Sequence, residues 1–265
     1  MINIKISKLS QFYFAVVIKV NQNKNMMKKH ISILSLLLFL VASSFAQKTV
    51  QAEDIIKDIK AGKDVSIVNA TIEGVLDFTY MEEKLDDLPR RKKKWWNGNW
   101  GSNTVNNTIE TKVSFTNCMF TDHVLAYIPD SDDSGYTFIA NFEDDAIFKN
   151  CTFERKAMFK YSEFDKNASF EGAQFEDDTT FKYAKFDNYI SFANTRFSES
   201  ATFKYSEFSD GVSFKNAQFE EDLNIKYTKV RGKFNISGMK VAYDIDSKYT
   251  KINGQSFSKY LLNNQ

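Results

Sequence analysis

Phenylalanine recurs through the second half of the chain in steps of five and six residues. It occupies positions 148, 153, 159, 164, 170, 175, 181, 186, 192, 197, 203, 208, 214 and 219. The segment 146–244 can be written as nine blocks of equal length, each eleven positions long, in which a small residue usually stands two positions before the phenylalanine. A fixed period over this length indicates a repeat architecture.

The spacing within a block favours strands over a helix. At about 100° per residue, two phenylalanines five residues apart would lie about 140° apart around a helix and would form no apolar stripe. A period of two instead points Ala157 and Phe159 inward and Met158 outward. The chain then turns through Lys160–Tyr161 and starts a new face at Ser162. We expect short strands wound into a solenoid.

Alternate blocks differ at the corner, which sets the length of one coil. A Lys-Tyr pair stands at 160/161, 182/183, 204/205, 226/227 and 248/249, whereas Asn or Gly stands at 150, 172, 194, 216 and 238. The true period is therefore two blocks, or twenty-two positions, with four faces per coil. In that register Glu163, Lys185, Glu207 and Lys229 form an outward ladder of alternating charge, about 4.8 Å apart.

Earlier and later segments fit the same frame. Residues 65–80 predict a first coil and Val113 begins the second, with insertions at 81–112 and 129–135, so the solenoid spans 65–255. Within residues 47–64, the segment Glu53–Lys60 predicts a short amphipathic helix that ends before Gly62. We expect residues 256–265 to cap the other end, because an open coil end exposes a strand edge.

These blocks resemble the repeats of the pentapeptide-repeat proteins, roughly A-x-F/L-x-x, with a small residue two positions before a large one. The resemblance covers about residues 65–255 and implies an all-β, right-handed quadrilateral parallel β-helix. This chain inserts one residue at every second face, so we expect one wider corner per half-coil. The family shares no catalytic residues, and the resemblance implies a non-catalytic scaffold or binding module without a cofactor. Some members mimic DNA and inhibit gyrase, which is a less favoured alternative here.

The beginning of the chain predicts export. Met27-Lys28-Lys29-His30 precedes an apolar core at 31–42, and Ser44-Phe45-Ala46 is a small-x-small cleavage site. This core is too short to span about 30 Å of hydrocarbon as a helix. We therefore interpret residues 1–46 as a signal peptide of an exported bacterial protein, periplasmic or extracellular after cleavage near Ala46. Residues 1–25 are either an upstream extension before a start at Met26 or Met27, or a long basic region.

Cleavage changes the charge of the protein. The whole chain has 35 basic and 34 acidic residues; loss of the six lysines before position 47 leaves 29 basic and 34 acidic, a net charge of −5. This charge argues against a nucleic-acid partner. Two His and two Cys residues argue against a multi-histidine metal centre and a disulfide-rich scaffold.

The first candidate binding segment lies in the first insertion. It contains Arg90, Arg91, Lys92, two further lysines, Trp95, Trp96 and Trp100. Aromatic rings beside cations suit an anionic glycan, a lipid headgroup or a protein partner. The alternative is a loop that folds back on the solenoid, with the indole rings covering it.

The second candidate is the corner with the Lys-Tyr pairs. Tyr161, Tyr183, Tyr205 and Tyr227 could form a flat carbohydrate-binding stripe. Stacked identical side chains also stabilise a β-solenoid by themselves, so both interpretations stay open.

Acidic clusters leave an enzymatic alternative, a carbohydrate-active β-helix. Residues 176–178 and 220–222 are two coils apart on one edge, and glycosidases use paired carboxylates. Nothing in the sequence buries either cluster, so we favour solvated corners and expect no catalytic residue. Residues 130–135 resemble a calcium loop but lack the later bidentate Glu, so we expect no metal. His123 has no Ser or Cys partner implied by spacing.

Cys118 and Cys151 both stand at small inward positions. If residues 124–145 form an interrupted half-coil, the two cysteines are one coil apart and are a candidate disulfide after export. Parallel strands in register aim such side chains poorly, so a reduced pair is the alternative. As partners we expect an envelope glycan or a protein, and a homodimer through one end of the solenoid is a further candidate.

Overall fold

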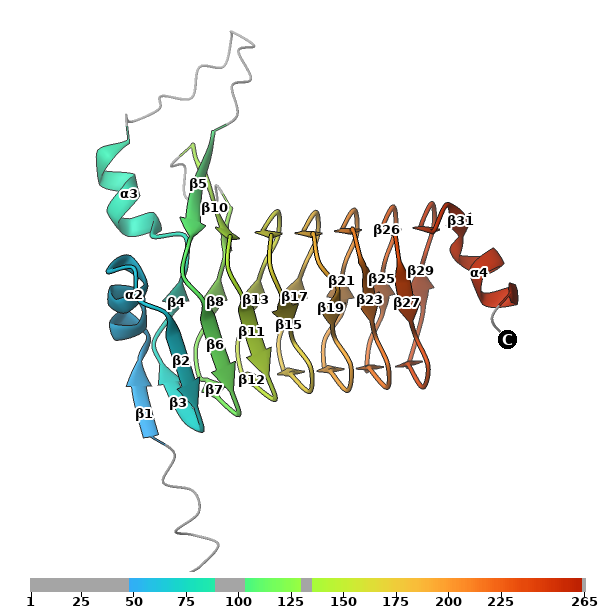
Figure 1. Ribbon diagram of the computed structural model, residues 1–265, viewed down its shortest axis with the longest axis horizontal. Helices are drawn as coiled ribbons and strands as arrows, with labels where there is room; N and C mark the ends of the chain where they lie inside the picture. The colour runs from blue at the N-terminus through green and yellow to red at the C-terminus, as the bar shows by residue number, and fades with distance from the viewer. Residues whose placement is uncertain (1–47, 89–102, 130–134, 264–265) are drawn as a thin grey trace, which may run out of the picture. The chain divides into compact units, whose positions relative to one another are not determined.

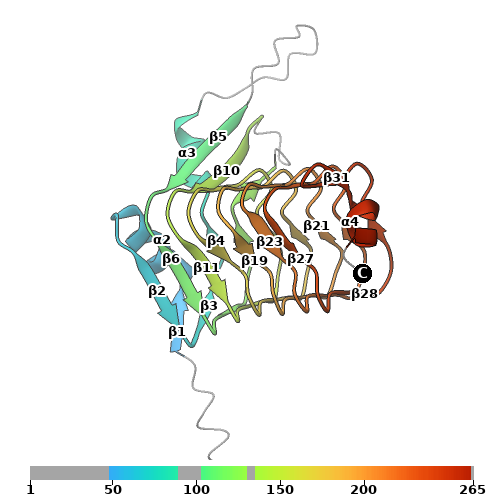
Figure 2. The same cartoon turned by 45° about the vertical axis from the view of Figure 1, so that its right-hand side comes forward.

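The computed structural model describes residues 48–88, 103–129 and 135–263. Their strands form four parallel sheets around one interior, and the chain passes through the four in turn as it advances coil by coil (Figure 1 and Figure 2). The expected fold class, a four-sided parallel β-solenoid, is confirmed. We number the sheets side 1 to side 4, in the order in which a coil visits them.

Sides 1 and 2 carry the first half of each coil. Side 1 consists of β2 (Val65–Val68), β6 (Val113–Thr116), β11 (Ala146–Lys149), β15 (Ala168–Ser169), β19 (Ile190–Ser191), β23 (Gly211–Ser213) and β27 (Lys233–Asn235). Side 2 consists of β1 (Lys48–Gln51), β3 (Ala70–Glu73), β7 (Met119–Phe120), β12 (Thr152–Phe153), β16 (Gln174–Phe175), β20 (Arg196–Phe197), β24 (Gln218–Phe219) and β28 (Lys240–Val241). The strand β1 pairs in parallel with β3 and so covers the first edge of side 2.

Sides 3 and 4 carry the second half. Side 3 consists of β4 (Leu76–Asp77), β8 (Val124–Leu125), β13 (Ala157–Met158), β17 (Thr179–Thr180), β21 (Ala201–Thr202), β25 (Leu223–Asn224) and β29 (Ile245–Asp246). Side 4 consists of β5 (Thr104–Ile109), β10 (Thr137–Phe142), β14 (Glu163–Phe164), β18 (Lys185–Phe186), β22 (Glu207–Phe208), β26 (Lys229–Val230) and β30 (Lys251–Ile252). Two short strands pair antiparallel with it, β9 (Tyr127–Ile128) on β10 and β31 (Gln255–Ser256) on β30.

The register confirms the predicted coil length. Ala157 pairs with Thr179, which pairs with Ala201, and the other three sides step by the same interval from β11 onward. The two earlier coils are longer, since Val113 pairs with Val65 before it and with Ala146 after it, and both lie more than one repeat away in the sequence.

The predicted insertion 81–112 was too long. Its last part forms β5, the fourth side of the first coil, which pairs over six residues with β10. The error has a physical cause: the register places Asn107 of β5 opposite Ala140 and Ile109 opposite Phe142, so β5 lacks both the small residue and the phenylalanine of the repeat. Because β5 lacks the repeat, its position depends on pairing with β10, which is equally long.

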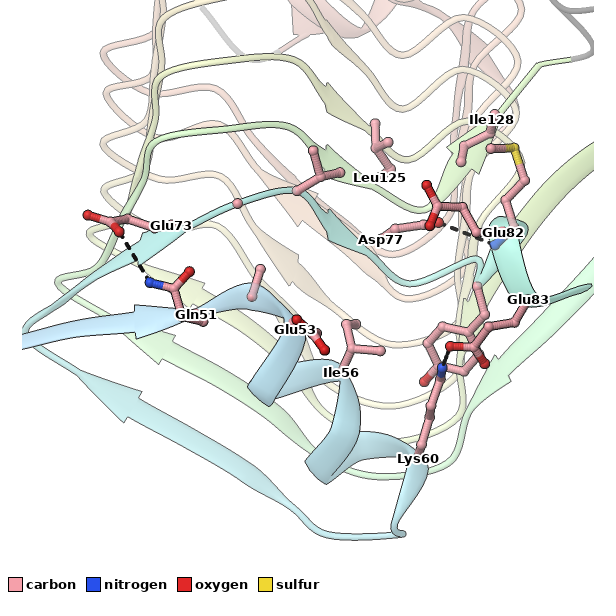
Figure 3. A pocket seen from close by; sticks show the side chains of 15 residues that line it. Gln51, Glu53, Ile56, Lys60, Glu73, Asp77, Glu82, Glu83, Leu125 and Ile128 are labelled. Carbon is pink, nitrogen blue, oxygen red and sulfur yellow. Dashed lines mark hydrogen bonds and ion pairs between the residues drawn. The ribbon is translucent and has the colours of Figure 1, made fainter.

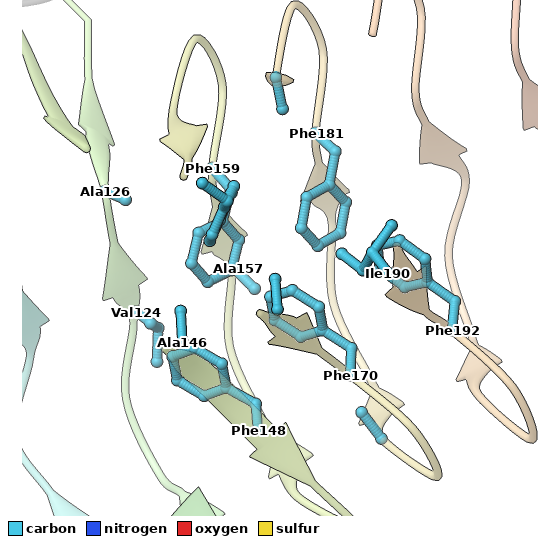
Figure 4. Packing of buried hydrophobic residues seen from close by; sticks show 14 of the residues in the cluster. Val124, Ala126, Ala146, Phe148, Ala157, Phe159, Phe170, Phe181, Ile190 and Phe192 are labelled. Atoms are coloured by element: carbon cyan, nitrogen blue, oxygen red, sulfur yellow. The ribbon is translucent and has the colours of Figure 1, made fainter. Parts of the chain in front are cut away.

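Phenylalanine fills the interior of the tube. Phe148, Phe170 and Phe192 stack up one side with ring centroids 5.1 and 5.3 Å apart and planes within 3° (Figure 4). Rings of neighbouring sides meet edge to face, as Phe159 and Phe170 do at 5.3 Å. Each buried ring contributes roughly 1.5–3 kcal/mol from burial and each aromatic pair about 0.5–1.5 kcal/mol more.

Three helices flank the solenoid in the described part of the chain: α2 (Ala52–Lys60), α3 (Met81–Asp87) and α4 (Phe257–Asn263). The predicted N-terminal helix is confirmed as α2, which buries Ile55 and Ile59 against the first coil and ends before Gly62 at φ +73°. At the other end, α4 buries Phe257. Among the described helices, none is both long and apolar enough to cross a membrane.

Candidate functional site: the Lys–Tyr ladder

The corner between sides 3 and 4 is a tight turn with a tyrosine in a left-handed conformation. The Ser206 N–H donates to the Phe203 carbonyl at 3.0 Å, and Tyr205 between them has a φ of +64°. The corner between sides 1 and 2 has the same conformation, but there Asn or Gly holds it, as Asn150 (φ +51°) and Gly172 (φ +69°) do. Asn and Gly adopt this region readily, whereas a bulky residue does not. The tyrosines therefore need another source of stability.

Stacking supplies that stability. The rings of Tyr161, Tyr183, Tyr205, Tyr227 and Tyr249 follow one another at centroid distances of 4.8, 4.6, 4.7 and 4.8 Å, with planes within 21°. The predicted vertical adjacency of Tyr183 and Tyr205 is confirmed, with planes 1° apart. We call these five tyrosines, with the lysine that precedes each, the Lys–Tyr ladder.

The stacking direction determines what the ladder can contact. Because each inner ring faces its two neighbours, the faces of the inner rings are covered and only their edges and hydroxyl groups point outward. Tyr249 ends the ladder and is 58% exposed. A sugar ring therefore cannot lie flat on Tyr183 or Tyr205, in contrast to the carbohydrate stripe that the sequence suggests.

The five ladder lysines lie against these rings. Their ammonium nitrogens stand 4.8, 5.2, 5.2, 6.0 and 5.1 Å from the centroids of the tyrosine that follows each. Lys160 also donates to the Tyr127 hydroxyl at 3.0 Å, and the Tyr127 ring lies 5.9 Å from that of Tyr161. Sequence reasoning missed Tyr127, because it stands before the repeat begins and outside the period of the ladder.

Few carboxylates neutralise this row of cations. Within the part of the chain that the structure describes, Lys226 is the one ladder lysine in an ion pair, with Asp246 at 3.8 Å. Burial, and then the neighbouring charges of Lys160 and Lys204, lower the pKa of Lys182. A lowered lysine pKa means that the charged form is disfavoured where it stands, and an added anion would relieve this.

Side 4 beside the ladder has the opposite character. Lys185 pairs with Glu163, and the Lys229 ammonium lies 2.7 Å from the Glu207 carboxylate, so the predicted alternating charges are confirmed. The alternation ends at Lys251, which pairs in register with Lys229. Most charges on side 4 are thus paired within the fold, whereas in the described chain only one of the five ladder lysines has a carboxylate partner.

Two members of the acidic clusters belong to an ion-pair cluster on side 2. Arg196 donates to the Glu220 carboxylate at 2.7 Å and to the Glu176 carboxylate at 3.2 Å. The hydrogen bond from Arg196 lowers the pKa of Glu220, whereas a general acid needs a raised one. This geometry gives the pair a structural role and lends the enzymatic alternative no support.

The other candidates carry no metal geometry. In residues 48–88, 103–129 and 135–263, no group of three or more His, Cys, Asp and Glu side chains is placed to hold a metal ion. His123 lies beside Asp122, with 4.0 Å between its Nε2 and the carboxylate. Residues 130–134, which contain most of the candidate calcium loop, lie outside the described residues.

The basic and aromatic segment also lies outside the described residues, with Arg90, Arg91, Lys92, Trp95, Trp96 and Trp100. Its role in binding an anionic ligand stays a prediction. The described chain stops at Leu88 before it and resumes at Asn103 after it.

Cys118 and Cys151 are neighbours one coil apart, as predicted, because Met119 and Thr152 pair in register. Both are buried free thiols, so the candidate disulfide is not formed in this structure. A hydrogen bond from the Cys151 thiol to the Cys118 thiolate lowers the pKa of Cys118 to about 7. The same hydrogen bond and burial raise the pKa of Cys151. If the protein is exported, oxidation of the pair stays a prediction.

Comparison with known proteins identifies the repeat. A family model described as "Pentapeptide repeats (9 copies)" matches residues 140–185 and 181–229. No curated protein and no solved structure matches the chain.

Proposed function

We propose that this protein is an exported module that binds acidic polysaccharides along the Lys–Tyr ladder. Residues 140–229 are pentapeptide repeats, and this family supports a repeat scaffold or binding module. One observation carries the proposal. Five stacked lysines lie on one corner of the solenoid, and within the described chain an ion pair neutralises only Lys226.

The spacing of the ladder suits a linear polymer. Successive coils rise by about 4.8 Å, so the ammonium groups repeat at a short, regular interval along a rigid support. A polymer with regularly spaced carboxylates can contact several lysines at once, and each further contact forms at a high effective concentration. Each lysine already rests on a tyrosine ring, which reduces the entropy lost on binding.

The surroundings of the ladder favour a glycan over a nucleic acid. The tyrosine edges present hydroxyl groups, which can exchange hydrogen bonds with sugar hydroxyls. The cleaved chain has a net charge of −5, which repels a polymer as densely charged as duplex DNA. An acidic polysaccharide has fewer charges per unit length and many more hydroxyl groups.

The proposed export rests on the chain before Lys48. The unit that contains the solenoid begins at Lys48, and the predicted cleavage after Ala46 would leave only Gln47 before β1. Cleavage would therefore leave every described strand of the solenoid in place. The intact mass of the protein produced in a bacterial host tests this, since a retained segment 1–46 would contradict it.

The binding proposal is tested with alginate, a linear polyuronate, and with neutral dextran of similar length. We expect alginate to bind in isothermal titration calorimetry, more weakly as salt rises because the charges are exposed, and dextran not to bind. Lys182→Gln with Lys204→Gln should weaken alginate binding at least about tenfold, or about 1.4 kcal/mol.

Lys185→Gln with Lys229→Gln is the matched control. It removes two positive charges from the adjacent side 4, where both lysines are already paired with glutamates. We expect less than a twofold change in affinity. An equal loss of alginate affinity in the two double variants would mean that net charge, and not the ladder, determines binding. Tighter binding of duplex DNA than of alginate would overturn the assignment to glycans.

A further inference from the structure

A cavity of about 460 Å³ opens beside the first two coils of side 3 (Figure 3). The helix α2 forms one wall and the beginning of α3 forms another, while residues 73–77, Leu125 at the end of β8 and Ile128 in β9 form the floor. We infer that this cavity binds a small organic cation with an apolar body, such as an aryl-alkylamine. The site shares no residue with the Lys–Tyr ladder.

The floor of the cavity is apolar. Leu125 points outward from side 3, where the register places Met158 in the next coil and Thr180 and Thr202 in the two after it. Val75, 43% exposed, and Ile128 continue this apolar surface. Outward residues of a solenoid side normally face water, so apolar ones that line a cavity indicate an apolar ligand group.

The rim of the cavity is acidic. Five carboxylates line it, with a single basic residue, Lys60: Glu53, Glu73, Asp77, Glu82 and Glu83. Asp77 has a structural role, since it accepts hydrogen bonds from the Thr79 and Met81 N–H groups, at 2.8 and 3.3 Å, at the start of α3. The excess of carboxylates favours a cation over an anion or a neutral ligand.

The protein already holds one cation in this way. The Lys60 ammonium pairs with the Glu83 carboxylate and lies 4.6 Å from the centroid of the Tyr80 ring. A ring face together with a carboxylate is the arrangement that proteins use to bind ammonium groups. Glu53 on the same rim is paired with Lys57 at 2.8 Å, whereas Glu82 is in no ion pair among the described residues and can serve an amine whose apolar body contacts Leu125.

The volume limits the size of the ligand. Small-molecule pockets occupy roughly 300–1,000 Å³, and this cavity of about 460 Å³ falls within that range. A folded protein partner could not insert more than a side chain. We therefore assign the cavity to a small molecule.

The test compares two ligands that differ only in charge, 4-phenylbutylamine and 4-phenylbutanol, by calorimetry on the full chain. We expect the amine to bind at least about tenfold more tightly than the alcohol. The variant Glu82→Gln should remove most of this preference, while Leu125→Lys should abolish binding because it places a cation in the cavity.

Glu199→Gln is the control. Glu199 is an exposed glutamate at the corner before β21, three strands beyond β8 on side 3, and we expect its loss to leave amine binding unchanged. Equal affinities for amine and alcohol, no binding of either, or an unchanged preference in the Glu82→Gln variant would each overturn the inference. Loss of alginate binding in the ladder variant would not bear on it.

Discussion

At the scale of single residues, the fold depends on corner positions that need a left-handed backbone. Tyrosine fills them between sides 3 and 4, and Asn or Gly fills them between sides 1 and 2. On that second corner the asparagines also join each other, as Asn216 Nδ2 donates to Asn194 Oδ1 at 3.2 Å. Gly172 interrupts this row above Asn150.

Substitutions at two glycines, Gly211 and Gly172, should differ strongly in their effect on stability. Gly211 has a φ of +105°, and a Cβ there would lie 2.2 Å from the carbonyl oxygen of Lys233 and 2.7 Å from its backbone nitrogen. Since a neighbouring strand cannot move aside, we expect Gly211→Ala to lower the free energy of unfolding by about 3 kcal/mol. Urea denaturation of the purified variant measures this.

Gly172→Asn is the counterpart. An added Cβ would meet the Asn150 Oδ1 at 2.1 Å, but that atom ends a side chain that can rotate into the hydrogen bond seen between Asn216 and Asn194. We expect a change within about 0.5 kcal/mol. A loss as large as that of Gly211→Ala would show that Asn150 cannot move.

At the scale of elements, short outward side chains serve the corners as well as the sheets. Thr180 accepts a hydrogen bond from the Lys182 N–H at 3.2 Å, and Ser191 accepts one from the Ala193 N–H at 3.2 Å. Ser, Thr and Asn at these positions of sides 1 and 3 thus satisfy backbone donors at the next turn. Their recurrence needs no ligand to explain it.

The charge ladder on side 4 predicts a pH dependence. A hydrogen bond from Lys229, with charges that include Lys229 and Lys185, lowers the pKa of Glu207 below its ordinary 4.5. A lowered carboxyl pKa adds stability above the unfolded value, and this stability disappears as pH falls through the folded value. Because both side chains are partly exposed, we expect about 0.5 kcal/mol.

Denaturation of the native chain and Glu207→Gln at several pH values checks this prediction. The native chain should be the more stable of the two at pH 7, and the difference should close below about pH 4. Glu199→Gln, at an exposed corner, serves as the control. A difference that persists at pH 2 would assign the effect to packing instead of charge.

The elements that the sequence predicts are those that the repeat dictates. Tyrosine at one corner of each coil established the register, and the amphipathic pattern of Glu53–Lys60 predicted α2. Neither β5 nor α3 could be predicted, because both lie where the phenylalanine pattern is absent. Their positions depend on tertiary partners, such as the Asn107 side chain that donates to the Phe78 carbonyl at 2.6 Å.

At the scale of the whole molecule, the same limit applies to the sites. The ladder positions were predictable, since a fixed period places them in one row. The direction of the ring faces and the scarcity of counter-charges were not, because they depend on rotamers. The cavity forms where α2, α3 and the second coil contact one another. It could not be predicted, because local sequence patterns do not indicate contacts between elements far apart in the chain.

A defect in the core of a solenoid should destabilise mainly the coils next to it. Phe181 stacks on Phe159 and Phe203 at 5.2 and 5.1 Å and meets Phe170 and Phe192 edge to face, both at 5.1 Å. We expect Phe181→Ala to lower the free energy of unfolding by about 3–5 kcal/mol, from lost burial and an unfilled cavity. Each coil contacts only its neighbours, so the damage should stay near the removed ring.

Hydrogen exchange resolves where the protection is lost. Amides of β13, β17 and β21, which surround Phe181 on side 3, should exchange faster in the variant, while those of β2 and β6 should keep most of their protection. Phe234→Ala is the control, because Phe234 is only partly buried in the last coil and its ring centroid lies 6.4 Å from that of Phe214. This variant should lose less than half as much free energy of unfolding as Phe181→Ala. Uniform loss of protection from β2 to β27 in Phe181→Ala would contradict this prediction. It would mean that the solenoid unfolds as one cooperative unit, in which a defect in any coil destabilises all coils.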